Sequence, residues 1–389
     1  MINVENTEVA FAYRSNAELK KAYLLFKMIA SPKLVKTGKH MINLCNKIYL
    51  PINWAIKPTI YKQFCGGITL DECLPLADKL AKYKVYSILD YSSESQESEA
   101  AFQHVVDEIA YSIDLAAKNK NIAYTVYKPS AIGKEEVLIK ASSGAPLNEE
   151  EKKDIENFKH RMDILCKKAY ENNIRILVDA EDHSYLKIVD DTTVELMRKY
   201  NKENAIVFIT LQMYRWDRLD YLTNLIALAR KEGFKPGVKL VRGAYMERER
   251  RRAAEMGYPS PIYPDKAGSD EGYNGALKLC VENIDIVSLF SGTHNEQSCE
   301  YLVNLMAQNN LQPGDKRIFF SQLLGMSDHL SFNLANAGYN VSKYIPYGPV
   351  REVLPYLIRR AEENTSVAGQ TGRELRLLTQ EIKRRKIKV

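Results

Sequence analysis

The spacing of apolar positions changes near residue 83. Before that point apolar side chains recur at helical intervals, as in "AYLLFKMIA" (22–30), and "TLDE" at 69–72 has the pattern of a helix-capping box. From Lys84 onward, short β-branched and aromatic runs alternate with longer amphipathic stretches. This alternation is typical of βα units built around a parallel sheet.

Eight such runs follow one another along the chain. They are "VYSILDYS" from 85, "IAYTVYKPS" from 122, "IRILVDAE" from 174, "AIVFITLQ" from 205, "GVKLVRGAY" from 237, "DIVSLFSGTHN" from 285, "RIFFSQLLG" from 317 and "VSKYIPYG" from 341. The segments between them have helical spacing, and several end in Asn, which suits a helix C-cap. The pattern predicts an α/β fold, a (β/α)8 TIM-like barrel with an N-terminal helical arm. We divide the chain into the arm (1–82), the barrel (83–367) and a basic C-terminal tail (368–389).

Polar residues stand where the apolar runs stop. The second run ends at Lys128, the third at Asp179 and the fourth at Gln212, and the fifth passes through Lys239 and Arg242. The sixth ends in "THN". Barrel enzymes assemble their sites from residues at the carboxyl ends of several strands. The pattern therefore predicts an active site at this face.

The stretch "YIPYGPVREVLPYLIRRAEEN" (344–364) adds a second candidate group. Tyr356, Arg359 and Arg360 fall at i, i+3 and i+4 of a predicted helix, so they share one face. Two guanidiniums on one face are suited to binding a carboxylate through paired charge-assisted hydrogen bonds. A surface ion-pair ladder is the alternative. Because proline disrupts a helix interior, we expect this helix to start or kink at Pro355.

Composition places the chain among ordinary soluble globular proteins. Of its 389 residues, 45% are hydrophobic and 27% are charged, and the net charge is +6. Much of that charge lies in two local runs, "ERERRRA" (247–253) and "KRRKIKV" (383–389). The simplest interpretation is a solvated helix face and a disordered end. A basic scaffold that binds nucleic acid through these runs is an alternative.

Several classes of site and location are disfavoured. The six cysteines are scattered with no CxxC pair, which indicates reduced thiols and a cytoplasmic location. No run of 18 or more apolar residues and no secretory signal pattern is found. Cysteines and histidines have no metal-ligand spacing, so we predict no metal site. The absence of GxGxxG argues against a Rossmann crevice for a cofactor.

The motifs "KLVRGAYMERER", "GTHN", "QLLGM" and "YIPYGPVREVLPYLIRRAEEN", in this order, resemble the proline dehydrogenase family from about Ala22 to Val367. The resemblance implies an FAD-dependent barrel that oxidises L-proline to 1-pyrroline-5-carboxylate, the first step of proline catabolism to glutamate. It also implies transfer of electrons to a membrane quinone. The two basic runs are then candidates for a peripheral contact with the inner face of that membrane. The length leaves no room for the aldehyde dehydrogenase domain of fused relatives, so we expect a monofunctional enzyme that binds no nucleic acid.

The resemblance also implies roles for substrate-binding residues. Arg359 and Arg360 would bind the proline carboxylate, and Lys128 would lie beside it, paired with Asp179. Three residues would enclose the pyrrolidine ring: Leu323, Tyr344 and Tyr356. Relatives that prefer hydroxyproline tend to carry a smaller residue at the position of Tyr344, so this tyrosine favours proline.

Catalytic and cofactor roles follow in the same way. Asp179 would shape the pocket, and Lys239 would approach N5 of the flavin, where many bacterial members carry Arg. The positions that match FAD contacts are Ala180, Gln212, Arg242, Gly243, Ala244, Thr293 and His294. No dedicated base for the proline nitrogen is evident. Alternatives are a hydroxyproline dehydrogenase and a Schiff-base barrel aldolase that uses Lys128 or Lys239 as its nucleophile.

Overall fold

A computed structural model describes residues 3–31, 37, 56–366 and 370–388, apart from the side chains of 361–366 and 370–371. The chain forms two compact units, which are described separately below. One unit comprises residues 1–87 together with 322–389, and the other comprises residues 88–321. This partition differs from the three-part division made from the sequence, which stays a prediction.

The strands form a closed barrel in which β1 to β8 follow one another in chain order. Each strand coincides with one of the eight predicted runs, so the predicted (β/α)8 fold is confirmed. The strands are β1 (Val85–Tyr91), β2 (Ile122–Tyr127), β3 (Arg175–Val178), β4 (Val207–Gln212), β5 (Gly237–Val241), β6 (Ser288–Gly292), β7 (Ile318–Leu323) and β8 (Val341–Tyr347).

Unit 88–321 holds the central strands of the sheet, which pair in parallel. Thr125 lies opposite Ile176, Ile209 opposite Val238, and Leu289 opposite Ile318. Almost every residue of β2 to β5 is buried, as expected for parallel strands that are covered on both faces. Such strands have continuous apolar runs, which made them readily visible in the sequence.

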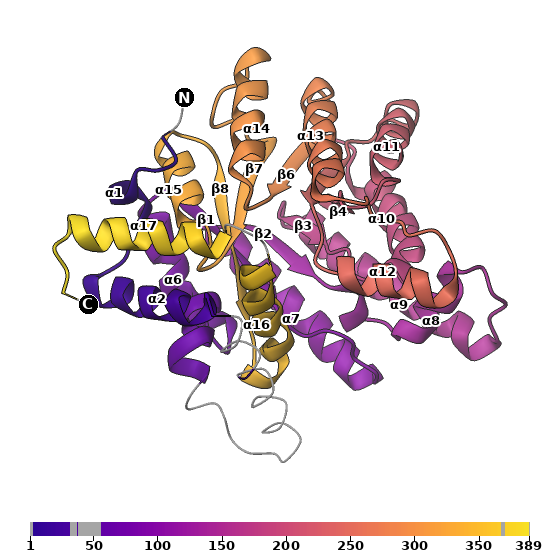
Figure 1. Cartoon of the computed structure of the whole chain (residues 1–389). Coiled ribbons are helices and arrows are strands. Elements are labelled where there is room, and N and C mark those ends of the chain that lie inside the picture. The colour runs from indigo at the N-terminus through magenta and orange to yellow at the C-terminus, as the bar shows by residue number, and fades with distance from the viewer. Residues whose placement is uncertain (1–2, 32–36, 38–55, 367–369, 389) are drawn as a thin grey trace. The chain divides into compact units, whose positions relative to one another are not determined.

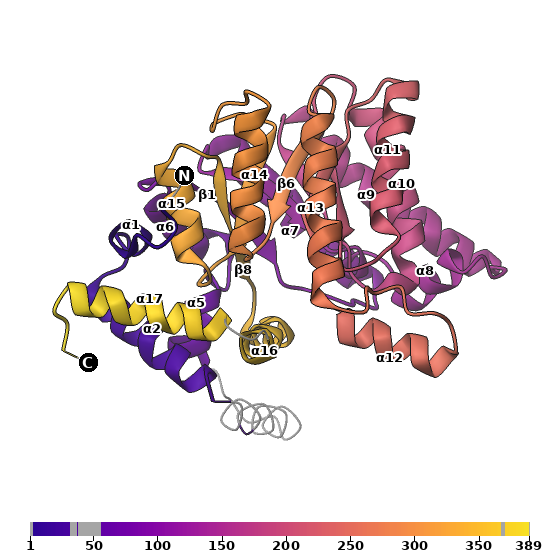
Figure 2. The same cartoon turned by 45° about the horizontal axis from the view of Figure 1, so that its top comes forward.

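Helices cover these strands from outside. In Figure 1, α7, α9, α10 and α13 lie along β2, β3, β4 and β5 respectively, and Figure 2 shows α13 and α14 side by side. Polar N-caps start several of them: for example, Asn148 and Glu151 form a reciprocal capping box before α9. The helices of this unit are α7 (Glu99–Lys118), η2 (Pro129–Ala131), α8 (Glu135–Ser142), α9 (Glu149–Glu171), η3 (His183–Tyr185), α10 (Leu186–Tyr200), α11 (Arg218–Glu232), α12 (Met246–Met256), α13 (Lys266–Glu282) and α14 (Glu296–Gln308).

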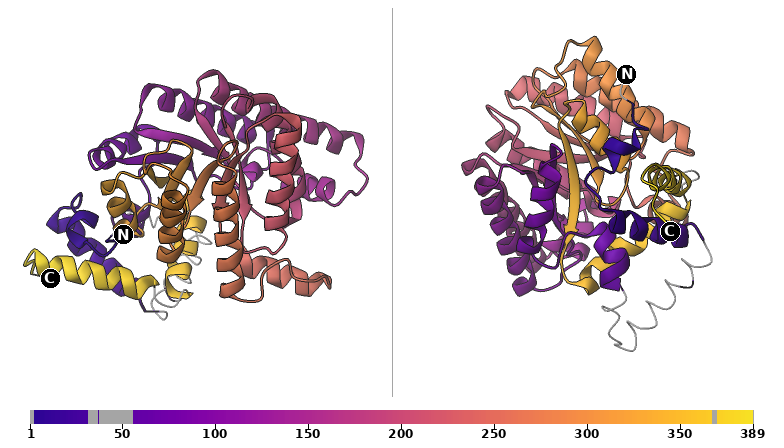
Figure 3. Two further views of the ribbon diagram at one scale, coloured as in Figure 1. Left: turned by 90° about the horizontal axis from the view of Figure 1, so that it is seen from above. Right: turned by 90° about the vertical axis from the view of Figure 1, so that its left-hand side faces the viewer.

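The other unit brings the two ends of the chain together. Its helices are α1 (Thr7–Ala10), α2 (Asn16–Ile29), η1 (Lys57–Tyr61), α5 (Lys62–Phe64), α6 (Leu70–Ala81), α15 (Asp328–Asn336), α16 (Val350–Ser366) and α17 (Gln370–Arg384). Figure 3 shows α17 running along α2. A shared apolar cluster contains Leu19 and Phe26 of α2, Leu357 of α16 and Leu378 of α17. Residues 32–36 and 38–55 of the predicted arm lie outside the described residues.

One prediction for this unit is wrong, and another is wrong in part. The C-terminal segment is the helix α17 and not a disordered end, because Leu375, Leu378 and Ile382 recur at helical spacing among its charges and pack into the apolar cluster. The last helix of the barrel, α16, begins at Val350 and passes through Pro355. Its start precedes Pro355 by about one and a half turns, so the predicted start at Pro355 is wrong, whereas the predicted kink at Pro355 stays a prediction.

None of the helices in the described parts of the chain has the length and apolar run that a bilayer crossing requires.

Candidate functional site

Charged and amide side chains gather at the carboxyl ends of the strands in unit 88–321. Lys128 follows β2, Asp179 follows β3, and Gln212 is the last residue of β4. Lys239 lies within β5, and Arg242 comes directly after that strand. Parallel strands in a barrel share one carboxyl-end face, so the fold places the predicted residues of this unit on the same face.

Lys239 and Asp179 form a direct ion pair. The Nζ atom of Lys239 donates a hydrogen bond of 2.5 Å to Oδ1 of Asp179, and both side chains are largely buried. A buried ammonium is costly unless a carboxylate compensates its charge. This pair therefore links β5 to the end of β3 and fixes a cation at the strand ends.

Lys128 pairs with Asp90 rather than with Asp179, so the predicted Lys128–Asp179 pair is wrong. Its Nζ donates to Oδ1 of Asp90 at 2.5 Å and to the carbonyl oxygen of Tyr91 at 3.2 Å. The strand β2 has an acidic residue on each neighbouring strand end, and Lys239 engages the carboxylate of Asp179. Burial tends to lower the pKa of Lys128, but Asp90 outweighs it and raises that pKa, so Lys128 is an ammonium.

Asp90 was missed by the sequence reading, although a signal for it was present. It is the single charged residue within the apolar run "VYSILDY", and it lies next to the carboxyl end of β1. It is buried, and that burial raises the pKa of its carboxyl group. Searching the first strand end as well as the later ones would have found it.

Glu181 is a second missed residue. Its buried carboxylate accepts hydrogen bonds from the backbone N–H of Ser130 at 2.9 Å and from the hydroxyl of Ser130 at 2.8 Å. Ser130 Oγ in turn accepts from the N–H of Ser95 at 3.2 Å. Glu181 thereby ties the turns that follow β1, β2 and β3 to one another. Burial, with the nearby charge of Glu94, raises the pKa of Glu181 to about 7.

Gln212 is held by the same turn and retains one unused acceptor. Its Nε2 donates to the carbonyl oxygen of Glu181 at 2.9 Å and to that of Ala180 at 3.4 Å. Its Oε1 is buried and has no hydrogen-bond partner among the described residues. A buried polar atom without a partner is uncommon and indicates a missing ligand or water.

Arg242 and Thr293, both predicted cofactor contacts, are brought together. The guanidinium of Arg242 donates to Thr293 Oγ1 at 2.8 Å, to Asp270 at 2.8 Å and to Ser298 Oγ at 2.9 Å. It also lies over the ring of Tyr273. Thr293 begins the turn after β6, followed by His294, so these contacts join the ends of β5 and β6.

The turn after β5 is built so that its backbone approaches neighbours closely. Gly243 has φ of +116°, and a Cβ atom placed on it would overlap the ring of Tyr214. Gly243 and Ala244 are both exposed, so their backbone is accessible to a ligand. The hydroxyl of Tyr214 donates a hydrogen bond to the buried carboxylate of Glu249 in α12. This hydrogen bond anchors α12.

The remaining predicted residues lie in the other unit. Leu323 ends β7 and Tyr344 lies in β8, and the N–H of the following Leu324 donates to the carbonyl oxygen of Tyr344 at 2.8 Å. The guanidinium of Arg360 lies 5.2 Å from the ring centroid of Tyr356, one helical turn earlier. Both are buried, whereas Arg359 is partly exposed. The predicted helical face of α16 is therefore present.

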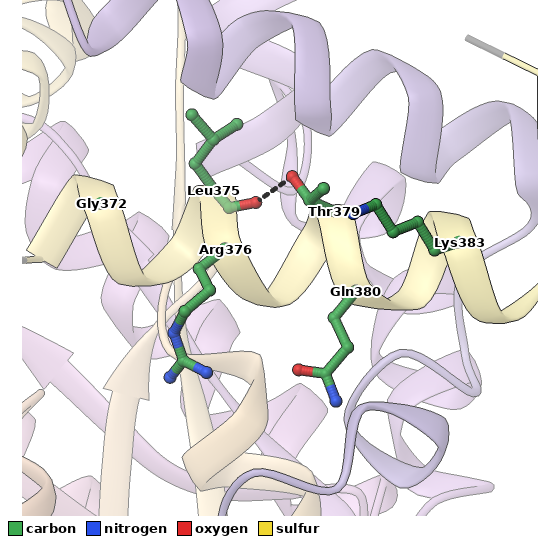
Figure 4. A pocket seen from close by; sticks show the side chains of 6 residues that line it. All are labelled: Gly372, Leu375, Arg376, Thr379, Gln380 and Lys383. Atoms are coloured by element: carbon green, nitrogen blue, oxygen red, sulfur yellow. Dashed lines mark hydrogen bonds between the residues drawn. The ribbon is translucent and has the colours of Figure 1, made fainter.

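A separate hollow of about 540 Å³ lies along α17 (Figure 4). Figure 4 shows its lining from one helix face, including Leu375, Arg376 and Lys383, and no predicted site residue contributes to it. In the parts of the chain that the structure describes, no group of three or more His, Cys, Asp or Glu residues is placed to hold a metal ion.

Comparison with known protein families explains this arrangement. The sequence model of the family described as "Proline dehydrogenase" matches residues 73–373, which is most of the chain. The protein belongs to the proline dehydrogenase family. The match includes the whole barrel and every predicted site residue, and it confirms the family identified from the four motifs.

Curated relatives resemble the chain over different lengths. "Proline dehydrogenase 1, mitochondrial" of Dictyostelium discoideum is 32% identical over 98% of this chain and 74% of its own length. The protein of the same name from Homo sapiens is 44% identical over 61% of this chain, and the match spans only 40% of the human protein. "Hydroxyproline dehydrogenase" of Xenopus laevis is 31% identical over 96% of this chain and 88% of its own length.

Solved structures support the fold. Proline utilization A (PutA) from Bdellovibrio bacteriovorus superimposes with a TM-score of 0.72 at 23% identity, covering 85% of this chain and 36% of PutA. A PutA mutant of Bradyrhizobium japonicum gives a TM-score of 0.68 over 89% of this chain at 20% identity. At these identities the likeness establishes the barrel architecture alone.

Proposed function

We propose that this protein oxidises L-proline to 1-pyrroline-5-carboxylate with FAD as its cofactor and a quinone as the electron acceptor. The observation that carries the proposal is the buried Asp179–Lys239 pair at the strand ends of a proline dehydrogenase barrel. Relatives named for this activity support the choice of substrate, among them the Dictyostelium protein, whose match covers 98% of this chain.

The residues at the strand ends of unit 88–321 fit a flavin. The unsatisfied Oε1 of Gln212 offers an acceptor for the single N–H of an oxidised isoalloxazine ring. The exposed backbone at Gly243 and Ala244 is accessible to a ligand, and Arg242 supplies positive charge for a pyrophosphate. The residues that would hold FAD are Ala180, Gln212, Arg242, Gly243, Ala244, Thr293 and His294.

Bound FAD would accept the hydride equivalent that leaves the ring carbon next to the proline nitrogen. Lys239 would hold a fixed positive charge beside the flavin ring, and Asp179 would keep that ammonium oriented. Such preorganised charge requires no rearrangement during the reaction. Lys128 would add a second cation near the substrate, oriented by Asp90.

We propose that Arg359 and Arg360 bind the proline carboxylate. Bidentate binding by guanidinium groups fixes the orientation of a planar carboxylate, and orientation of this kind lowers a reaction barrier by several kcal/mol. Leu323, Tyr344 and Tyr356 would enclose the pyrrolidine ring. The proline nitrogen must be neutral before hydride leaves, because its lone pair stabilises the cation that forms.

Hydroxyproline is the second candidate substrate. The hydroxyproline dehydrogenase of Xenopus laevis matches nearly the whole chain, which keeps this candidate open. Tyr344 favours proline, because a bulky ring leaves less space for a hydroxyl group on the substrate. The aldolase alternative is disfavoured for Lys128, since a Schiff-base lysine needs a lowered pKa and Asp90 raises it.

The cellular setting forms part of the proposal. A cytoplasmic protein that contacts the inner face of a membrane would deliver electrons to a membrane quinone. The relatives from Dictyostelium and human are named as mitochondrial.

One spectroscopic experiment tests the cofactor and the substrate together. The purified protein is examined by visible absorption and then mixed with L-proline without oxygen. An oxidised-flavin spectrum that bleaches with L-proline, but slowly with trans-4-hydroxy-L-proline, supports the proposal. Faster bleaching with hydroxyproline would favour the second candidate. A colourless protein that stays inert after addition of FAD would overturn both.

A further inference from the structure

The turn between β7 and α15 has an unusual backbone. It joins Leu323 to Asp328 and contains two left-handed residues, Gly325 with φ of +78° and Ser327 with φ of +50°. A left-handed conformation is unfavourable for a residue with a side chain such as Ser327, which is also fully buried. Conformations of this kind persist only where the surroundings enforce them.

The first enforcing contact is a buried ion pair. Lys343 Nζ lies 2.9 Å from Oδ1 of Asp328 and donates to the carbonyl oxygen of Met326 at 2.6 Å. It also reaches the carbonyl oxygen of Leu323, at 3.4 Å. Lys343 therefore holds both ends of the turn. Burial would raise the pKa of Asp328, but Lys343 and Arg14 outweigh it and lower that pKa to about 2.

Residues from the N-terminal segment complete the coordination of Asp328. The hydroxyl of Tyr13 donates to Oδ2 of Asp328 at 2.7 Å, and Arg14 donates to the same oxygen at 2.9 Å. Arg14 also donates to Oε1 of Gln63 at 3.2 Å, and Gln63 donates to the carbonyl oxygen of Gly325 at 2.9 Å. The turn is thus held from outside by three residues from the first 63 of the chain.

A C-terminal residue holds the strained position itself. The N–H of Ser327 donates to Oε1 of Glu374 in α17 at 2.6 Å, and Glu374 is buried. The family match covers residues 73–373, so Tyr13, Arg14, Gln63 and Glu374 all lie outside it. These four residues therefore contact the turn from beyond the segment that the family model matches.

Two of the proposed substrate-lining residues are positioned by the network. Tyr344 directly follows Lys343, and its carbonyl oxygen accepts from the N–H of Leu324. Leu323 directly precedes the turn, and its carbonyl oxygen faces Lys343 Nζ. A displacement of Lys343 would move both backbones, because Tyr344 follows it directly in β8 and the carbonyl oxygen of Leu323 accepts from its Nζ. Asp328 holds Lys343 in place through their ion pair.

We propose that Tyr13, Arg14, Gln63 and Glu374 act through the Asp328–Lys343 pair as positioning residues for Leu323 and Tyr344. The chain's two ends thereby determine how tightly the substrate ring is enclosed. The inference rests on the proposed function for its effect on proline, whereas its structural part can be tested without turnover.

The test compares two tyrosines of one aromatic cluster. Tyr13→Phe removes the hydroxyl bonded to Asp328 but keeps the ring, which stacks on Phe332 at 4.4 Å between centroids. Tyr83→Phe is the matched control: its ring also packs edge-on against Phe332, while its hydroxyl donates to the carbonyl oxygen of Ala12. Amide hydrogen exchange at Leu324 and steady-state kinetics with L-proline are measured on both variants and the wild type.

In Tyr13→Phe we expect faster exchange at Leu324 and a KM for L-proline raised about threefold to tenfold, with kcat and flavin content nearly unchanged, as for loss of one hydrogen bond to a charged group. Tyr83→Phe is expected to match the wild type. Arg14→Lys, which keeps the charge, should show a smaller rise in KM than Arg14→Gln.

The outcomes separate the two proposals. Wild-type protein that does not oxidise proline overturns the proposed function, while exchange at Leu324 still tests the positioning network. Unchanged exchange in Tyr13→Phe and Arg14→Gln would overturn the network. Faster exchange with an unchanged KM in a protein that oxidises proline would overturn its link to substrate binding.

Discussion

The ammonium of Lys239 donates a 2.5 Å hydrogen bond to the carboxylate of Asp179, across the ends of two strands that are not neighbours in the barrel. The strand β4 lies between β3 and β5, so the two side chains meet across β4. The pair therefore connects β3 and β5 across β4. It also places the positive charge of Lys239 beside the proposed flavin site.

Asp179→Asn and Lys239→Met should each destabilise the protein by about 3 kcal/mol, because each leaves a buried charge without its partner. The double variant should recover part of that loss, since no uncompensated charge remains. Urea unfolding of the four proteins measures the coupling free energy. Simple additivity of the two single effects would mean that the pair acts only in the reaction.

Arg360→Met should raise the KM for L-proline by about tenfold or more while flavin stays bound, because a charge-assisted hydrogen bond to the carboxylate is lost. The methionine keeps apolar contact with Tyr356, over whose ring the guanidinium now lies. Arg351→Met, on an exposed position of the same helix, serves as the control. Normal proline kinetics in Arg360→Met would remove this residue from the carboxylate site.

Tyr344→Ser should raise the ratio of kcat/KM for trans-4-hydroxy-L-proline to that for L-proline by about tenfold, as expected when space for one hydroxyl is created. Tyr344 is largely buried in β8, so its truncation opens a cavity rather than a surface. Tyr339→Ser, located before that strand, is the control. An unchanged ratio in Tyr344→Ser would exclude this tyrosine from substrate selection.

The sequence was sufficient for the barrel because parallel strands buried on both faces are continuous apolar runs, and all eight were visible. It was also sufficient to place Asp179 and Gln212 at strand ends and Lys239 within the fifth strand. It did not predict the partner of Lys128, since pairing depends on which strand ends face each other. The roles assigned to Arg359 and Arg360 remain predictions.

The C-terminal helix was missed for a different reason. Its apolar face consists of only a few residues, Leu375, Leu377, Leu378 and Ile382, so the surrounding lysines and arginines dominated the composition of residues 370–388. The sequence did not predict that Glu374 of this helix contacts Ser327, because nothing in a linear sequence relates these two positions. Contacts between distant segments of this kind require the folded structure.

Glu181 should make stability fall as pH rises from about 5 to about 7. Its pKa is raised by burial from 4.5 to about 7 in the folded protein, so the folded state binds more protons than the unfolded state within that interval. Across this interval the free energy of unfolding should fall by an amount on the order of 3 kcal/mol. Burial also raises the pKa of Asp190 to about 7, so its titration likewise lowers the free energy of unfolding as pH rises.

Glu181→Gln removes the titrating group and keeps an acceptor for Ser130. The free energy of unfolding measured from pH 5 to 7.5 should therefore vary less with pH in this variant than in the wild type. Glu136→Gln, a change on the exposed first turn of α8, is the control. Identical slopes in Glu181→Gln and wild type would show that Glu181 titrates normally.

Gly243→Ala should weaken flavin binding strongly, because its Cβ would overlap the ring of Tyr214 and displace the turn that carries Arg242 and Ala244. Gly257→Ala is a matched control: it also has a positive φ, of +72°, but a Cβ there meets no atom within 4 Å. Backbone strain alone costs about 1 kcal/mol at such a position. We therefore expect Gly257→Ala to retain flavin with a slightly lower melting temperature.

The measurement is the ratio of flavin to protein after gel filtration, followed by titration with FAD. Gly243→Ala should be purified with little flavin and should bind added FAD at least about tenfold more weakly, the effect of losing about 1.4 kcal/mol of binding free energy. The second substitution Tyr214→Leu, made in the Gly243→Ala background, relieves the overlap and should restore part of the affinity. Flavin retention in Gly243→Ala equal to that in Gly257→Ala would place the cofactor away from the end of β5.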